Sequence, residues 1–307
     1  MGGNDSVGYA INDLGQITGH AQTAALGANE HAFIYTNGSM ADLQTLGGVF
    51  SVGYAINNAG QVAGTSDLAG QTAQHAFVYA NGKMNDLGTL GGTNSFAFGI
   101  NTAGQITGAS DLGTTRYAFL YANGRMQNLG TLPGGTQSDG FAINTRGDIV
   151  GFATGGSLGN KCCAFLYHNG AMYNLNSLID PSSPLASHVS LVQAAGINDN
   201  GWIVADGYDS QANRYDTYML QPILPPVNDL LAALLAEVIG VGPGKSLANK
   251  VMSAQTYYAV PDIQSTCAVL TGFVNEVKAR AGKKIAQPLD ARLVAAAEAI
   301  EVAIGCN

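Results

Sequence analysis

Short runs of alternating apolar and polar residues, separated by turns rich in glycine and asparagine, fill the first two thirds of the chain. The pattern G-Y-A-I-N-x-x-G-Q-I/V-x-G stands at 8–19 and again at 53–64, and drifted copies begin at residues 97, 140 and 195. The central isoleucine of each copy marks the repeat: Ile11, Ile56, Ile100, Ile143 and Ile197. Internal repeats at this spacing indicate a series of similar supersecondary units that pack against one another.

A second motif follows in the first four units, reading H-A-F-I-Y, H-A-F-V-Y, Y-A-F-L-Y and C-A-F-L-Y. Each copy runs into an Asn-Gly pair, which supplies the positive φ angles of tight hairpin turns. Each complete unit therefore holds four short β-type runs, and one four-stranded sheet cannot bury both of its faces alone. We predict an all-β, five-bladed β-propeller of four-stranded antiparallel blades that pack in a ring.

The predicted propeller occupies residues 1–222, and its fifth blade is shorter than the others. The blades are expected at about 6–50, 51–94, 95–137, 138–192 and 193–222. The fifth unit lacks a fourth β-type run, while residues 1–6 match the tail of a D-L-G-T-L-G-G-x-x-S segment without the strand that should precede it. We expect the precursor to hold that strand upstream, so that the last blade is three-stranded here or is completed by another element.

The periodicity changes after a proline-rich linker at 223–227. Apolar residues then recur at helical spacing over 230–238, and helix-like runs follow at 246–258, 262–281 and 290–304. These runs predict a small all-α bundle at 228–307. Cys267 and Cys306 fall on adjacent predicted helices, where a disulfide would staple a small core. Two buried thiols are the alternative.

Cys162 and Cys163 are neighbours just before a predicted strand. Successive side chains of a strand point to opposite faces, which favours one buried and one exposed thiol. A strained vicinal disulfide is the alternative. A metal pair is disfavoured, because no third cysteine or nearby histidine has ligand spacing.

Charged residues make up only 11% of the chain, and the net charge is −8. Its field repels polyanions, which argues against nucleic acid or an anionic membrane as the main partner. The longest apolar stretch, 230–240, is too short to span a bilayer. A glycine-rich surface of small neutral polar residues is typical of extracellular β-proteins. We therefore expect a secreted or cell-surface protein whose signal peptide has been trimmed.

The strings H-A-F-x-Y-x-N-G and D-L-G-T-L-G-G resemble the bacterial extracellular HAF-repeat family over roughly residues 1–222. The strings S-L-A-N-K, F-V-N-E-V and A-G-K of the C-terminal part are similar to the FIMAH-type module of bacterial secreted proteins. The first resemblance implies β-propeller repeats and little about chemistry. The second implies an accessory or surface-association role, and a plain helical cap or spacer is the alternative.

Tight turns are expected on one face of the ring and longer, variable loops on the other. Variable loops on a rigid scaffold are the usual place of binding and catalysis. Carboxylates and aromatic rings on or beside these loops are candidate ligand-binding residues: Asp67, Asp111, Tyr117, Tyr208, Asp209 and Tyr215. Our leading interpretation is a binding protein for a small molecule, a glycan or a surface polymer.

A Ca²⁺-assisted hydrolase of lactones or esters is the alternative, by analogy with other propellers. Asp139, Asp180 and Asp209 are the candidate Ca²⁺ ligands, because this ion prefers oxygen ligands around a channel mouth. His188 is the candidate general base, with Asp180 and Asp139 as its catalytic partners. A glycosidase is disfavoured, since Asp139 is the single acid at the entry of the inner strands and that reaction needs two carboxylates.

Overall fold

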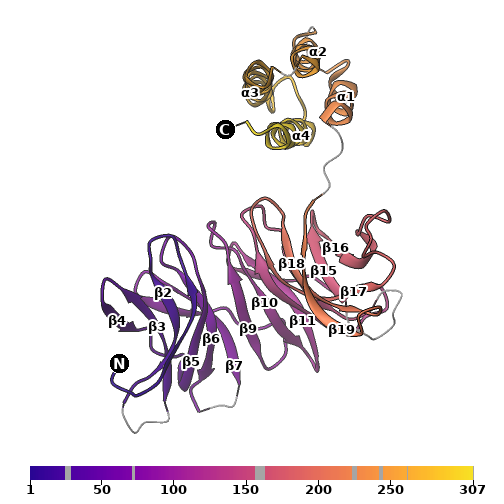
Figure 1. The fold of residues 1–307 in the computed structure, drawn as a ribbon. Helices are drawn as coiled ribbons and strands as arrows, with labels where there is room; N and C mark the ends of the chain where they lie inside the picture. The colour runs from indigo at the N-terminus through magenta and orange to yellow at the C-terminus, as the bar shows by residue number, and fades with distance from the viewer. Residues whose placement is uncertain are drawn as a thin grey trace. The chain divides into compact units, whose positions relative to one another are not determined.

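A computed structural model describes residues 1–24, 29–70, 73–155, 163–222, 227–241, 245–260 and 262–306. The chain divides into two compact units, Met1–Gln221 and Pro222–Asn307. The first unit is built of strands and the second of helices, as the change of periodicity predicts (Figure 1). The helical unit begins at Val227, one residue before the predicted start, and residues 223–226 of the expected linker lie outside the described part.

The β unit contains nineteen strands among its described residues. The first eight are β1 (Ser6–Ile11), β2 (Ile17–Gln22), β3 (Glu30–Thr36), β4 (Ser39–Asp42), β5 (Gly47–Ile56), β6 (Val62–Leu68), β7 (Gln74–Ala80) and β8 (Lys83–Asp86). The next eight are β9 (Ser95–Ile100), β10 (Ile106–Leu112), β11 (Thr115–Ala122), β12 (Arg125–Asn128), β13 (Ser138–Ile143), β14 (Ile149–Ala153), β15 (Cys163–His168) and β16 (Ala171–Asn174). A short 3₁₀ helix, η2 (Leu175–Ser177), precedes the last three, β17 (Val189–Ile197), β18 (Ile203–Asp209) and β19 (Arg214–Leu220).

Each repeat of the sequence forms its own antiparallel meander. The strands of the third and fourth repeats make two four-stranded sheets, and those of the fifth make a three-stranded sheet. The first two repeats share an eight-stranded sheet, because β3 meets β5 through one parallel pairing of Glu30 with Phe50. The fifth repeat thus lacks a fourth strand among the described residues, as expected.

The predicted turns explain why the strands reverse where they do. Asn37, Asn81, Asn123 and Asn169 all have φ between 49° and 54°, and the glycine after each is also at positive φ. These Asn-Gly turns join the third and fourth strands of a repeat, and the N-x-x-G turns join the first and second. Because the strands are antiparallel, both kinds of turn lie at the same ends of the strands, and the longer connections lie at the opposite ends. We call the side of the unit that carries the longer connections the variable-loop edge.

Neighbouring sheets pack through apolar clusters that repeat along the unit. Each cluster joins a buried alanine and leucine of one sheet to an isoleucine or valine of the next, as Ala76 and Leu87 do with Ile106. Phe77, Phe119 and Phe165 are fully buried in successive clusters. The Phe of the repeated H-A-F motif is therefore a core residue of the inter-sheet packing.

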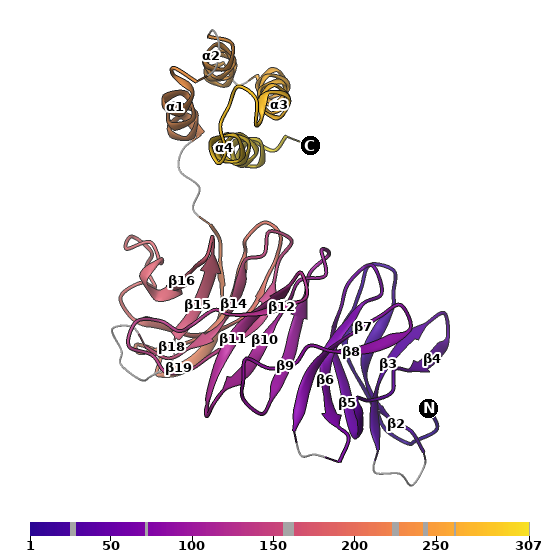
Figure 2. The ribbon, with the colours of Figure 1, turned by 180° about the vertical axis from the view of Figure 1, so that it is seen from behind.

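The sheets do not close into a ring. The first sheet and the last sheet lie at opposite ends of the row in two views (Figures 1 and 2). Ile11 on the first sheet is 67% exposed, whereas its counterpart Ile56 is 8% exposed. The expectation of a closed five-bladed ring is not met, because five repeats with this packing leave both terminal faces uncovered.

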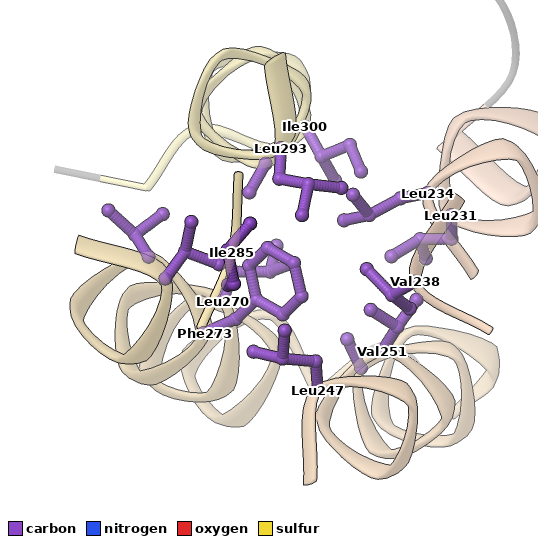
Figure 3. Close-up of a cluster of buried hydrophobic side chains, with 14 residues drawn as sticks. Leu231, Leu234, Val238, Leu247, Val251, Leu270, Phe273, Ile285, Leu293 and Ile300 are labelled. Atoms are coloured by element: carbon purple, nitrogen blue, oxygen red, sulfur yellow. The ribbon is translucent and has the colours of Figure 1, made fainter. Parts of the chain in front are cut away.

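The C-terminal unit is a four-helix bundle of α1 (Val227–Val238), α2 (Ser246–Ala259), α3 (Ile263–Arg280) and α4 (Leu289–Ile304). Figure 3 shows its core, in which Phe273 and Leu270 of α3 face Leu247 of α2 and Leu293 of α4. Cys267 and Cys306 form a disulfide, the pair expected from the sequence. Within the described residues, no helix has the length and apolar character needed to cross a membrane.

Candidate functional site

A row of aromatic rings runs across the first strands of four successive repeats. The ring centroids of Tyr9 and Tyr54 are 5.3 Å apart, those of Tyr54 and Phe98 are 5.6 Å apart, and those of Phe98 and Phe141 are 5.9 Å apart. Tyr9 is 49% exposed and the other three are half-buried. The row arises because each ring occupies the same position of the repeated motif, so sheet packing places one ring beside the next.

The row is connected to the variable-loop edge by Phe96. Its ring is stacked with that of Phe98 at a centroid distance of 6.4 Å and an interplanar angle of 4°. The guanidinium carbon of Arg116 lies 4.7 Å from the centroid of Phe96, in a cation–π arrangement. Arg116 also forms an ion pair with Asp139, with 2.8 Å between Nε and Oδ1.

Asp139 and Arg116 stay accessible at this edge, with side-chain exposures of 24% and 37%. Burial raises the pKa of Asp139, and the nearby Arg116 only partly offsets that effect. A carboxylate and a guanidinium beside an aromatic row can together accept hydrogen bonds from hydroxyl groups and donate hydrogen bonds to them. Sequence analysis singled out Asp139 but missed Arg116 and the rings, although their recurrence at one motif position was a readable signal.

A second group of candidates lies at the variable-loop edge of the last sheet. His188 Nε2 is 3.9 Å from Asp209 Oδ2. The backbone N–H groups of Ala212 and Gln211 donate to Asp209, and together with His188 they hold the pKa of its carboxyl below the ordinary value. The carboxylate is thus engaged in ordering the β18–β19 turn.

Two tyrosines accompany this group. The rings of Tyr208 and Tyr215 are 5.2 Å apart, and the Tyr208 hydroxyl donates to Asn213 Oδ1 over 2.6 Å. Tyr215 is 71% exposed. The structure therefore brings four sequence candidates, His188, Asp209, Tyr208 and Tyr215, to one edge.

The remaining candidates have local structural partners or stand apart. Asp67 accepts from Gln74 Nε2, and Asp111 accepts from the backbone and side-chain N–H groups of Asn94. Asp180 accepts from the backbone N–H of Ser182 in an exposed turn, and hydrogen bonds from Ser182 lower its pKa. Tyr117 is half-buried on β11. None of these forms part of the aromatic row.

Across the described ranges, no three histidine, cysteine or acidic side chains are grouped so that they could hold a metal ion. The expected Ca²⁺ ligands do not converge: Asp139 pairs with Arg116, Asp209 caps a turn beside His188, and Asp180 caps the turn at Ser182. These three carboxylates therefore form no pre-formed oxygen cage for Ca²⁺ with one another.

Repeated polar residues have structural roles. His31 Nδ1 contacts Asp42 at 3.0 Å and His75 Nδ1 contacts Asp86 at 2.9 Å, each pair linking the third strand of a repeat to the fourth. In the fourth repeat, Asn174 Nδ2 donates to the sulfur of Cys163, which is buried. Cys162 lies outside the described residues, so the expected pair of one buried and one exposed thiol stays a prediction, with the vicinal disulfide as its alternative.

No family model matches the chain, and no curated protein matches its sequence. A solved structure that is similar in part is TolB from Acinetobacter baumannii, with 12% identity and a TM-score of 0.42. The match covers 70% of this chain, and the chain spans about half the length of TolB, 54%. At this similarity the match supports no conclusion about function.

Proposed function

We propose that the β unit is a secreted, propeller-type array of five HAF-like blades that binds a polyhydroxylated ligand, such as a glycan, at its variable-loop edge. The supporting observation is the aromatic row together with the pair of Arg116 and Asp139, which is joined to the row at Phe98 through Phe96. Aromatic faces offer apolar contact area to the C–H face of a sugar, while a charged pair beside them recognises its hydroxyls. The ligand-binding role follows from this combination.

The composition of the edge favours a neutral ligand over an anionic one. The chain carries a net charge of −8, and Arg116 is already paired with Asp139. A neutral hydroxyl-bearing ligand needs no new charge partner and can bridge the two side chains. The helical unit would then serve as an accessory module, as its FIMAH-like strings imply.

The test is a glycan-binding screen of the full chain, followed by calorimetry on any ligand found. Asp139→Asn keeps the shape of the side chain but removes its charge and the ion pair. We expect at least a tenfold rise in Kd, since a hydrogen bond to a charged group contributes about 1.5–3 kcal/mol. Asp180→Asn is the matched control, because the Asp180 carboxylate accepts from Ser182 in a turn and contacts neither Arg116 nor Asp139, so its replacement should leave Kd unchanged.

A ligand whose Kd responds to Asp180→Asn and not to Asp139→Asn would refute this site. Adding EDTA forms a separate arm. Binding that uses Arg116 and Asp139 needs no metal, so chelation should leave Kd unchanged. Loss of binding or of ester hydrolysis in EDTA would instead support the Ca²⁺-assisted hydrolase, and His188→Ala would then test its general base.

A further inference from the structure

The two terminal faces of the β unit carry halves of a contact that the chain already makes four times. The side-chain amide of Asn12 donates to the backbone carbonyl of Asn57 over 2.9 Å, which links the first repeat to the second. The same bond recurs at each junction: Asn57 to Asn101 at 3.0 Å, Asn101 to Asn144 at 2.9 Å, and Asn144 to Asn198 at 3.3 Å. We call this series the asparagine ladder.

At each terminal face, the asparagine of the ladder lacks the partner that its counterparts have at the internal junctions. Asn198 is exposed, and within the described residues its side-chain amide donates to no acceptor. At the other end, the carbonyl of Asn12 accepts from the turn residue Gly15, and no asparagine side chain among the described residues donates to it. One face thus offers the donor and the other offers the acceptor of the same bond.

A threonine faces a glycine at the first and third internal junctions, whereas at the second both positions are alanine, Ala63 and Ala97. A Cβ on Gly53 would lie 2.2 Å from Oγ1 of Thr18 in the preceding repeat, and a Cβ on Gly140 would lie 2.4 Å from Oγ1 of Thr107 in the repeat before it. Gly53 and Gly140 therefore have no room for a side chain, because the second strand of the preceding repeat packs directly against them. At the last junction Val150 and Ala194 share one buried cluster.

The residues at these two positions on the terminal faces have no neighbouring repeat packed against them in the described part of the chain. A Cβ on Gly8 would meet only Ile17 of its own sheet, so the space that Thr18 fills over Gly53 is open over Gly8. On the last sheet, Val204 holds the position of Thr18 and Val150 and is 40% exposed, whereas those two are fully buried. Val204 and Gly8 therefore repeat the larger-to-smaller pairing of the first, third and fourth internal junctions.

Apolar exposure at both ends supports an association surface. Ile11 is 67% exposed on the first sheet, and Met219 is 64% exposed beside Val204 on the last, where the two are cross-strand partners. Paired apolar side chains on an uncovered sheet face mark an interaction site. Since the internal junctions bury these same positions, the matching occupant is another first or last repeat of this kind.

We propose that copies of the chain associate head to tail, with the last sheet of one copy packed on the first sheet of the next. Asn198 of one copy donates to the Asn12 carbonyl of its neighbour, and Val204 packs over Gly8. The contact is heterologous, because each copy uses a different face at its two ends. It therefore builds open chains or closed rings of copies, according to the rotation between them.

The test measures the mass of the full chain by light scattering and sedimentation over a range of concentrations. We expect mass to rise with concentration for the native chain. Ile11→Arg blocks the first face and Met219→Glu blocks the last, so each variant alone should stay monomeric. Leu178→Arg is the matched control, because Leu178 is 52% exposed in the turn after η2. This variant should associate as the native chain does.

Mixing the two blocked variants gives the sharpest outcome. Each retains the face that the other lacks, so an equimolar mixture should form a dimer of one copy of each and grow no further. A native chain that stays monomeric at all concentrations overturns the proposal, whether its ends close on each other or stay free. Association that survives both single variants also overturns it, because another surface must then be responsible.

Discussion

Replacing Asn101 tests whether the asparagine ladder stabilises the packing of the sheets. Asn101 is 4% exposed, and its side chain makes four hydrogen bonds. Its amide donates to Gln105 Oε1 and to the Asn144 carbonyl, and its Oδ1 accepts from the backbone N–H groups of Ala103 and Gln105. Asn101→Ala would therefore remove these four bonds from a turn in which Asn101 is buried and Thr102 and Ala103 are exposed.

We expect Asn101→Ala to lower the free energy of unfolding by about 3 kcal/mol, because leaving buried polar groups unpaired costs about 1–3 kcal/mol each and the losses are not additive. Asn198→Ala is the matched control. Asn198 is exposed, and among the described residues its side chain accepts one hydrogen bond, from the backbone N–H of Trp202, so a loss of about 0.5 kcal/mol is expected. The sixfold contrast is a consequence of position in the ladder, since the residue type is the same.

Urea unfolding followed by tryptophan fluorescence is the appropriate assay. Trp202 is the single tryptophan of the chain and lies in the β unit, so its signal reports on that unit without contribution from the helices. If the dependence of the unfolding free energy on urea, m, is about 3 kcal/mol/M, the urea midpoint of Asn101→Ala should fall by about 1 M relative to the native chain. Equal midpoints for the two variants would refute the view that the ladder carries stability.

Three further predictions concern charge, the core and the disulfide. Burial alone would raise the pKa of Asp148, but hydrogen bonds from His168, Asn144 and Arg146 outweigh that effect and hold the pKa below its ordinary value. The stabilisation from this carboxylate is therefore present above the ordinary pKa and is lost as the pH falls through the lower pKa of the folded state. Asp148→Asn should accordingly flatten the acid side of a curve of unfolding free energy against pH. Phe119→Ala should cost about 3–5 kcal/mol by urea titration because Phe119 is fully buried between sheets, while Tyr215→Ala should cost under about 0.5 kcal/mol. Cys267 and Cys306 are 39 positions apart, so reduction of their disulfide should destabilise the helical unit by about 4 kcal/mol in the chain-entropy account. The loss should be visible as a lower melting temperature of the helices with unchanged Trp202 fluorescence.

The repeats could be predicted because each is specified locally. The Asn-Gly turns and the alternating runs fix strand ends and register within a sheet, and the structure places them where the motifs indicate. The helices likewise begin and end within a few residues of the predicted runs. Closure of a ring is different, because it depends on the rotation between sheets, which no single motif encodes.

The candidate site was less predictable for the same reason. Asp139 could be recognised as an isolated acid, but its partner Arg116 belongs to a different repeat and reaches it through sheet packing. The aromatic row likewise exists only because equivalent positions of separate repeats become neighbours. Residues of one hairpin, such as Tyr208 and Tyr215, were found because their contact is nearly local.

The identity of the ladder bonds from junction to junction makes the repeats interchangeable in principle. If residues 57–100 were excised, Asn12 would be followed by Asn101, whose carbonyl is the same kind of acceptor that Asn57 presents. A shorter protein with one repeat fewer would keep every remaining junction. The length of such a protein can therefore change by unequal recombination between repeats without any new interface having to arise.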